Sequence, residues 1–407
     1  MKILHVTPVY VPAYHYGGPV SSISDLCSAL VSLGLDVTVF TTNANGETTL
    51  PINIDKEIVI DGVKVFRYPV KNQKSNFFFS PTMVKGLREH IKEFDLVHIH
   101  SIWNFPGIPA AFYSNKFNIP YIHSARGSLI MENQPGVYLN NIKKRIYFNL
   151  FLTRSFQNSA AVHYTAIQEY YQSDSKFRSI SSAFVVGNGI NCSDFEPIYS
   201  KQDAKKQLTI ENVGPTSEII TYIGRLHSRK GLDYLIKAFN LVLDERPNAH
   251  LILAGPDYGY KDVLQKLVKD LGLETHVHFT GFVNPDKRLL LLNSSDIFAL
   301  PSWRENFGIS IAEAMACAIP VLVSKNVCIQ NEIVEDGAGI ATDLSVDQIA
   351  LAILRILSDE QFKVQMGQRA YSSVRNRYDR LVVAEKMALA YEDIIQGKKS
   401  SKCEWVR

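Results

Sequence analysis

Two glutamates stand eight positions apart at the start of an apolar helix, and their carboxylates suit the binding of a polar ligand. Glu305 follows an apolar run, residues 297–301, that predicts a buried parallel strand. The apolar spacing over residues 309–316 predicts a mostly buried helix, and Glu313 falls about two turns into it. In open α/β sheets ligands bind outside the carboxyl ends of the strands, where this junction lies.

The spacing of the two carboxylates favours holding one extended ligand over cleaving a bond. A helical rise of about 1.5 Å per residue would separate their backbones by roughly 12 Å, whereas glycosidase carboxylates flank one bond at about 5 to 9.5 Å. A carboxylate accepts two hydroxyl donors at once, which matches vicinal sugar hydroxyls. The alternative is a solvent-facing Glu305 favoured by the helix dipole and a Glu313 paired with a buried base.

Further motifs precede and follow this pair in a fixed order. They are Gly17-Gly18, then Gly224-Arg225-Leu226-x3-Lys230-Gly231, and then Glu305-x7-Glu313 followed by Pro320-Val321. In this combination the chain resembles the retaining glycosyltransferases of family 4, which have the GT-B fold. The resemblance covers nearly the whole chain.

The resemblance implies both a fold class and a reaction. The fold is α/β, with two Rossmann-like parallel-sheet domains facing across a cleft. The reaction moves a hexose from a UDP- or GDP-sugar to a carbohydrate or lipid-linked acceptor, in polysaccharide or glycoconjugate biosynthesis. The nucleotide sugar is a substrate, so we expect no cofactor and no metal ion. The chain has no G-x-G-x-x-G motif, which disfavours a nicotinamide dehydrogenase.

By the same resemblance, residues of the second domain take defined roles. Glu305 and the amides that follow it hold the transferred sugar, and Glu313 holds the ribose hydroxyls. Arg225 and Lys230 neutralise the leaving diphosphate, with a solvated basic loop as the alternative. The backbone that follows two consecutive strands of the second domain, at Gly255 and at Phe282, contacts the nucleotide base. The substrate-binding residues expected here, besides Glu313, are Gly255, Phe282, Val283, Asn306, Phe307, Gly308 and Ile309.

The first domain, by resemblance the acceptor domain, contributes a glycine pair, a turn and an arginine. Gly17 and Gly18 let backbone amides approach a phosphate or sugar, unless they form an ordinary turn. Asn188 opens a turn typical of the family. Arg126 stands where the family often has a catalytic histidine, so we expect it to contact a phosphate or the acceptor. His123 is then a core residue.

Length, charge and residue composition argue against several other classes of protein. A length of 407 residues favours two α/β domains. The net charge of +3 is too small for a nucleic-acid protein. No apolar run reaches the roughly 18 residues that a membrane helix needs, so a cytoplasmic protein is expected. The histidines near strand ends, His98, His100 and His123, have no metal-ligand spacing. Five scattered cysteines fit a reducing compartment, with Cys27 and Cys317 in the core.

Strand and helix patterns divide the chain into three parts. Residues 1–198 predict the first domain, and the rhythm of strands restarts after a polar stretch to give a second domain over residues 199–378. Residues 379–407 contain a last amphipathic helix, which by resemblance crosses back to the first domain. Residues 398–407 read as a frayed tail.

A basic amphipathic stretch and two rival functions complete the predictions. Lys143, Lys144, Arg145 and Arg154 are the only charges amid the apolar and aromatic residues between 133 and 168. Such a segment contacts an anionic membrane or a phosphate-bearing acceptor, or it is a packed helix with a solvated basic face. The rival functions are a sugar-nucleotide epimerase of GT-B type and a non-catalytic scaffold that binds sugar nucleotides.

Overall fold

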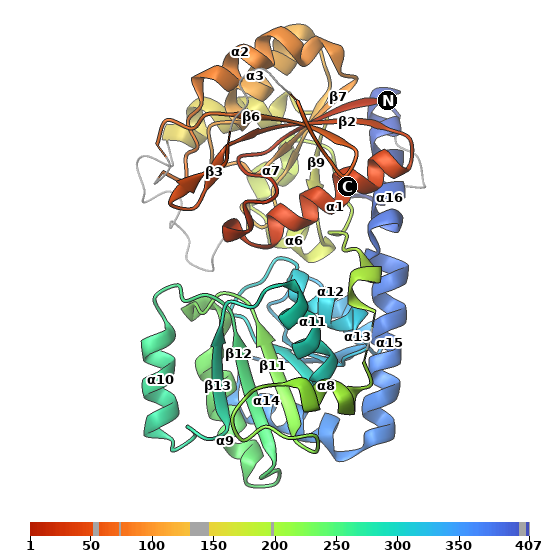
Figure 1. The fold of residues 1–407 in the computed structure, drawn as a ribbon. Coiled ribbons are helices and arrows are strands. Elements are labelled where there is room, and N and C mark those ends of the chain that lie inside the picture. The colour runs from red at the N-terminus through yellow and green to blue at the C-terminus, as the bar shows by residue number, and fades with distance from the viewer. Residues whose placement is uncertain (52–56, 73–74, 131–145, 197–198, 399–403, 407) are drawn as a thin grey trace. The chain divides into compact units, whose positions relative to one another are not determined.

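The chain forms two compact units in the computed structural model, which describes residues 1–51, 57–72, 75–130, 146–196, 199–398 and 404–406. The first unit comprises Met1–Ile190 and Arg380–Arg407, and the second comprises Asn191–Asp379 (Figure 1). The first unit thus ends at Ile190 instead of at 198. The reason is the 3-10 helix η4 (Cys192–Phe195), which packs on the second unit's α12 (Ile309–Ala316), where the Cys317 thiol donates to the Phe195 carbonyl at 3.3 Å.

A nine-stranded, mostly parallel sheet forms the centre of the first unit, in the order β17-β10-β9-β8-β7-β1-β2-β6-β5. Only the β5–β6 and β10–β17 pairs are antiparallel. The strands are β1 (Lys2–Val6), β2 (Asp36–Thr42), β5 (Ile58–Ile60), β6 (Val63–Tyr68), β7 (Leu96–His100), β8 (Tyr121–Ser124), β9 (Ala161–Tyr164), β10 (Ala183–Val185) and β17 (Glu404–Val406). A separate hairpin joins β3 (Ala44–Asn45) to β4 (Thr48–Thr49).

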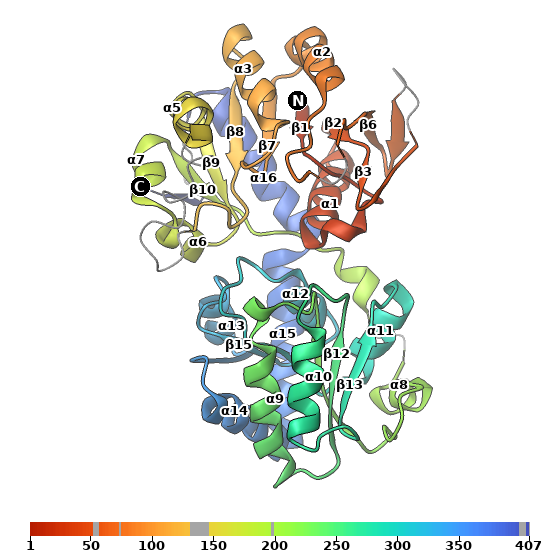
Figure 2. The ribbon, with the colours of Figure 1, turned by 90° about the vertical axis from the view of Figure 1, so that its left-hand side faces the viewer.

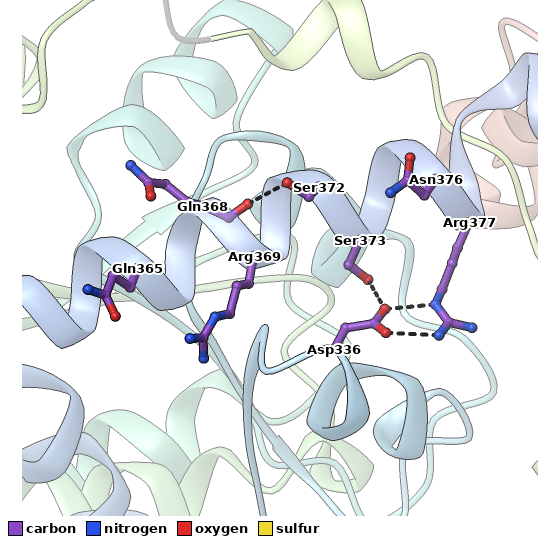
Figure 3. Close-up of a pocket in the computed structure, with 8 residues that line it drawn as sticks. All are labelled: Asp336, Gln365, Gln368, Arg369, Ser372, Ser373, Asn376 and Arg377. Carbon is purple, nitrogen blue, oxygen red and sulfur yellow. Dashed lines mark hydrogen bonds and ion pairs between the residues drawn. The ribbon is translucent and has the colours of Figure 1, made fainter.

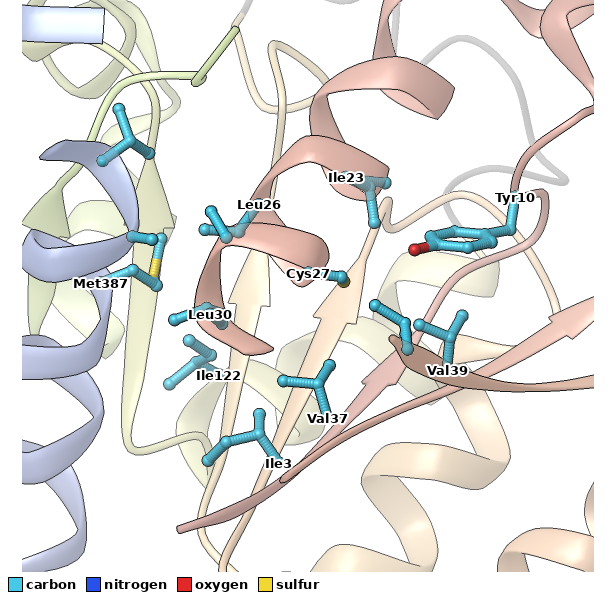
Figure 4. Packing of buried hydrophobic residues seen from close by; sticks show 14 of the residues in the cluster. Ile3, Tyr10, Ile23, Leu26, Cys27, Leu30, Val37, Val39, Ile122 and Met387 are labelled. Atoms are coloured by element: carbon cyan, nitrogen blue, oxygen red, sulfur yellow. The ribbon is translucent and has the colours of Figure 1, made fainter. Parts of the chain in front are cut away.

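Helices pack on both faces of this sheet because both faces are apolar (Figure 2). On one face, Leu26 and Leu30 of one helix and Met387 of another gather over Ile3 and Ile122 (Figure 4). The buried Cys27 belongs to the same core, as predicted. The helices are α1 (Gly18–Ser32) and α16 (Arg380–Ile395) on this face, and η1 (Tyr14–Tyr16), α2 (Pro81–His90), η2 (Ile91–Glu93), α3 (Gly107–Phe117), η3 (Phe148–Leu152), α5 (Thr153–Gln157), α6 (Ile167–Gln172) and α7 (Ser175–Ile180) elsewhere.

The end of the chain differs from the frayed tail that the sequence predicted. Residues 404–406 form strand β17, which pairs antiparallel with β10. Trp405 explains the difference: its ring lies 5.5 Å from that of Phe184, and its Nε1–H donates to Asp393 at 3.0 Å. Burying an aromatic ring and satisfying its polar end favours the ordered strand.

The second unit is built on a six-stranded parallel sheet in the order β13-β12-β11-β14-β15-β16. Its strands are β11 (Glu218–Ile223), β12 (Ala249–Ala254), β13 (Val277–Gly281), β14 (Ile297–Leu300), β15 (Val321–Ser324) and β16 (Gly339–Thr342). Its other helices are α8 (Lys201–Gln207), η5 (Ser228–Lys230), α9 (Leu232–Leu243), α10 (Lys261–Asp270), α11 (Pro285–Ser294), α13 (Gln330–Glu335), α14 (Val346–Ser358) and α15 (Glu360–Tyr378). The predicted α/β class with two Rossmann-like parallel-sheet domains is confirmed.

Each sheet reverses its strand order at one place. In the first unit the reversal lies between β1 and β7, and in the second between β11 and β14. At such a switch point the loops that follow two neighbouring strands diverge, and a ligand fits between them. The second switch point joins the loop that contains Lys230 to the loop that contains Glu305.

One buried carboxylate ties three elements of the second unit together. Asp296, directly before β14, binds the ammonium groups of Lys205 at 2.7 Å, Lys363 at 3.0 Å and Lys201 at 3.4 Å. It also accepts from the Ile219 amide at 2.9 Å. Burial alone would raise the pKa of Asp296, but the three lysines lower it to about 2.

Asp296→Ala is expected to lower the free energy of unfolding by about 3 to 5 kcal/mol, because the buried Lys205 would lose its counter-charge and Lys363 would keep only that of Glu360. With a depressed pKa, the stabilisation by Asp296 is complete above the unfolded-state pKa of about 3.9 and is lost as the pH falls toward 2. Urea unfolding measures both effects. Asp270→Ala, at an exposed carboxylate on α10, is the control. Equal unfolding midpoints for the two variants would contradict the role of Asp296.

Candidate functional site

The loops after β11 and β14 touch backbone to backbone. Gly231 has a φ of +65°, and a Cβ at this position would lie 2.0 Å from the carbonyl oxygen of Pro301. The Trp303 amide donates to the Arg229 carbonyl at 2.9 Å. Only glycine fits this approach, so the predicted basic loop and the predicted glutamate loop form one surface.

An ion pair between Lys230 and Glu305 joins the side chains of the same two loops. Both side chains are mostly buried. The Glu305 amide donates to the Asn326 carbonyl at 3.2 Å, and the Glu305 carbonyl accepts from the Cys328 amide at 3.0 Å. Because these strand-like bonds fix the backbone of Glu305, its carboxylate is held in place. A diphosphate bound to Lys230 would compete with this carboxylate for the ammonium group.

The ends of β11, β12 and β13 pack closely beside this pair. A Cβ on Gly255 would lie 1.8 Å from the Gly224 carbonyl oxygen, and the Gly255 amide donates to the Gly281 carbonyl at 2.7 Å. Arg225 is exposed, and its guanidinium lies 5.0 Å from the ring centre of Tyr258, a cation–π distance.

Two neighbouring residues after β13 differ in exposure. Phe282 is 67% exposed, whereas Val283 is buried. The Phe282 ring is therefore available to a flat ligand, while Val283 can contribute only its backbone.

The residues after Glu305 serve mainly to start helix α12. Phe307 is buried, with its ring 4.9 Å from that of Tyr378. Gly308 is left-handed, with a φ of +77°, and precedes Ile309, the first helical residue. The side chain of Phe307 is thus a core contact, which leaves the backbone of this turn for ligand binding.

Glu313 is buried and accepts from the guanidinium of Arg288 at 2.8 Å. Burial raises the pKa of Glu313, and Arg288 only partly opposes the rise. The alternative given above, a base paired with Glu313, is therefore present. Arg288 was missed at the sequence level because it lies on α11, 25 residues earlier, outside every motif.

In the first unit the structure brings Arg126 and Asn188 together beside helix α1. The guanidinium of Arg126 donates to the Ser22 hydroxyl at 2.7 Å and to the Asn188 side-chain oxygen at 2.8 Å. Burial lowers the pKa of Arg126 to about 10, so the group stays charged at neutral pH. Gly17 and Gly18 begin the same helix, and Gly17 has a φ of +81°.

Glu169 is a buried carboxylate beside Arg126 that the sequence did not single out. It accepts from the Gly127 amide, and from the amide and hydroxyl of Thr165 at 2.7 and 2.8 Å. These bonds fix the turn at Arg126, whose φ is +46°. Glu169 also raises the pKa of Arg126 against the effect of burial.

His123 is a core residue, as predicted. It is buried, its ring stacks on that of Phe156 with centres 4.4 Å apart, and its Nε2 shares a hydrogen bond with the Ser155 hydroxyl at 2.8 Å. On strand β8 its side chain points to the face opposite those of Ile122 and Ser124, because successive residues of a strand point to opposite faces.

A polar cavity of about 560 Å³ lies along α15 of the second unit (Figure 3). At its edge Arg377 donates twice to Asp336, at 2.7 and 2.9 Å, and the Ser373 hydroxyl donates to the same carboxylate at 2.6 Å. None of the predicted site residues lines it. Its one carboxylate, Asp336, is occupied by Arg377 and Ser373, so we do not assign it a ligand.

Of the four basic residues predicted to contact a membrane or an acceptor, one lies within the described residues. Lys143, Lys144 and Arg145 lie outside the described residues, and Arg154 lies on α5. Across the described part of the chain, every helix is too short or too polar to cross a membrane.

Two family models match the chain, one in each unit. Residues 203–373 match the model described as "Glycosyl transferases group 1", and residues 17–189 match the "Glycosyl transferase 4-like domain". An uncharacterized glycosyltransferase of Methanocaldococcus jannaschii is 28% identical, with 96% of this chain and 98% of the relative covered. The N-acetyl-alpha-D-glucosaminyl L-malate synthase of Bacillus anthracis is 24% identical over 85% of each chain.

Solved structures share the fold over nearly the whole length. Sucrose-phosphate synthase from Thermosynechococcus elongatus has a TM-score of 0.75 at 19% identity and covers 98% of this chain and 100% of its own. HepE of Anabaena, solved with UDP and glucose, has a TM-score of 0.70 at 20% identity, with 96% and 99% covered. Both similarities concern the fold alone.

Proposed function

This chain belongs to the family 4 glycosyltransferases of the GT-B fold, and we propose that it moves a hexose from a UDP- or GDP-sugar to a saccharide acceptor with retention of configuration and without a metal ion. The observation that carries the proposal is the Lys230–Glu305 ion pair at the switch point of the second sheet. In this proposal the ammonium group of Lys230 binds the diphosphate, and the neighbouring carboxylate of Glu305 binds sugar hydroxyls.

A nucleoside diphosphate sugar fits the loops around this pair. The backbone at Gly255 and Val283 would bound the base, and the ribose hydroxyls would bind the Glu313 carboxylate that Arg288 orients. Complexes of the structural neighbour HepE with UDP and with UDP-glucose support this donor class.

In the proposed reaction the bond between the anomeric carbon and the diphosphate oxygen breaks while the acceptor oxygen bonds to the same face of the sugar. Arg225 and Lys230 offset the charge that develops on the leaving diphosphate. A diphosphate oxygen takes the proton of the acceptor hydroxyl, so no side chain needs to act as a nucleophile. Glu305 and the amides of residues 306–308 hold the sugar during transfer.

For the acceptor we propose a lipid-linked saccharide used in polysaccharide or glycoconjugate synthesis at the cytoplasmic face of a membrane. An apolar patch supports it: Leu150 is 64% and Phe151 is 43% exposed, and the Tyr147 ring lies 5.6 Å from Phe151 and 6.2 Å from the half-exposed Phe77. Arg126 would meet a phosphate or a hydroxyl of the acceptor. Arg154 adds a cation beside the patch.

The donor class is tested by thermal shift with a panel of UDP- and GDP-sugars. A true donor at 100 times its dissociation constant adds about 2.7 kcal/mol to the free energy of unfolding. With that donor and an acceptor, proton NMR is expected to show a product whose anomeric configuration matches the donor, at an initial rate that brief EDTA treatment hardly changes. Manganese-reversible loss of activity with EDTA, or an inverted product, contradicts the mechanism.

Single substitutions separate the roles of the site residues. Glu305→Ala is expected to reduce turnover about 100- to 1000-fold while free UDP or GDP still binds, and Arg225→Ala and Lys230→Ala are expected to reduce turnover similarly. Glu313→Ala is expected to weaken nucleotide binding about 10- to 100-fold. Calorimetry and initial rates measure these effects, with the exposed Glu335→Ala as the control. Unchanged nucleotide affinity in Glu313→Ala would remove the ribose assignment.

Membrane docking is tested by cosedimentation with phosphatidylglycerol vesicles. The double variant Leu150→Ser and Phe151→Ser is expected to stay in the supernatant, because each buried apolar side chain contributes about 1.5 to 3 kcal/mol, and higher salt is expected to weaken the binding of the wild type. Leu351→Ser, at a similarly exposed leucine of the second unit, is the control. A wild type that never sediments would indicate a soluble acceptor.

A further inference from the structure

Three histidines meet at the switch point of the first sheet, outside the loops considered so far. His5 lies on β1, and His98 and His100 lie on the neighbouring β7, where His5 pairs with His98. All three side chains are buried. His5 Nδ1 lies 2.9 Å from His100 Nε2, and one nitrogen from each of the three rings lies within 4.8 Å of the others. Small rotations of the rings would bring these nitrogens around one ion.

Polar atoms without partners surround this cluster. Among the described residues, His98 Nε2, His100 Nδ1, His163 Nδ1 and the Ser124 hydroxyl are buried and accept or donate no hydrogen bond. The strand register places His100 opposite Ser124, and Ser124 opposite His163, so these residues share one face of the sheet. A buried polar atom without a hydrogen-bond partner is costly, and an ion or molecule that binds these atoms would remove that cost.

We propose that His5, His98 and His100 form a site for a late first-row transition metal ion, with Zn²⁺, Ni²⁺ and Cu²⁺ as the fitting ions. Imidazole nitrogens suit these ions, whereas Mg²⁺, Ca²⁺ and Mn²⁺ prefer oxygen ligands. The Tyr391 hydroxyl, 2.7 Å from His98 Nδ1 and 3.4 Å from His5 Nε2, orients two of the rings from helix α16. Such a partner beyond the ligands fixes the ring orientation of a metal-bound histidine.

The charges around the three histidines affect which metal ions can bind them. Burial first, and then the nearby Arg126 charge, lowers the pKa of His5 to about 3, and both effects also lower the pKa of His98 and His100. The imidazoles are therefore neutral at pH 7, the form that binds metals. The Arg126 charge that lowers these pKa values also repels a metal ion at the histidines. Ions that bind imidazole weakly are excluded for this reason.

The proposal is tested on the purified full chain after chelator treatment, by equilibrium dialysis with Zn²⁺ and by the visible absorption of bound Co²⁺. The wild type is expected to bind one Zn²⁺ per chain and to show the Co²⁺ spectrum of nitrogen ligands. His98→Gln and His5→Gln are each expected to weaken binding at least about 10-fold, since even partners outside the ligand shell contribute 10- to 100-fold. His278→Gln, in the histidine pair with His250 in the second unit, is the control.

A third variant keeps the test decisive if circular dichroism shows that a histidine variant is unfolded. Arg126→Gln removes the repelling charge and is expected to tighten Zn²⁺ binding, which a surface site would not show. A wild type without the Co²⁺ spectrum overturns the proposal. So does binding that His278→Gln abolishes, or that His98→Gln and Arg126→Gln leave unchanged.

Discussion

The close approach of two loops at the switch point of the second sheet is the constraint on which the candidate site depends. Gly231 lies against the Pro301 carbonyl, and no side chain fits between them. This approach brings Lys230 within reach of Glu305 and allows their ion pair. Because opposite charges on facing loops attract most strongly where water is scarce, the pair holds the two loops together.

The pKa values of two buried carboxylates in the second unit are shifted in opposite directions. The number of cations around each carboxylate explains why. Asp296 has three lysines, which outweigh the cost of burial and lower its pKa to about 2. Glu313 has the single guanidinium of Arg288, and burial prevails, so its pKa is raised. The first carboxylate is fully neutralised within the fold and stabilises it. The second keeps capacity to accept further donors, which suits hydroxyl binding.

The first unit concentrates polar groups at its own switch point, between β1 and β7. Arg126 is held there by Ser22 and Asn188, and Glu169 fixes the turn that carries it. Buried histidines lie on the adjoining strands. A sheet core is usually apolar, and polar groups at this depth are costly unless they are paired.

The sequence alone determined the class of the fold and predicted the main loops of the candidate site. Continuous apolar runs predict buried parallel strands wherever they occur, and glycine with basic or acidic residues after such runs marks the loops. These signals are local along the chain. Strand β17 was not predicted, because three residues are too few to show a periodic pattern. The strand is ordered by contacts of Trp405 with the distant Phe184 and Asp393.

Only the tertiary structure decided which residues face one another. Arg288 meets Glu313 through the packing of two helices, and Glu169 meets the Arg126 turn from 42 residues away. His5 reaches His98 and His100 because β1 and β7 pair across more than 90 residues of chain. Strand pairing and helix packing are set by burial of the whole core, and no short stretch of sequence contains that information.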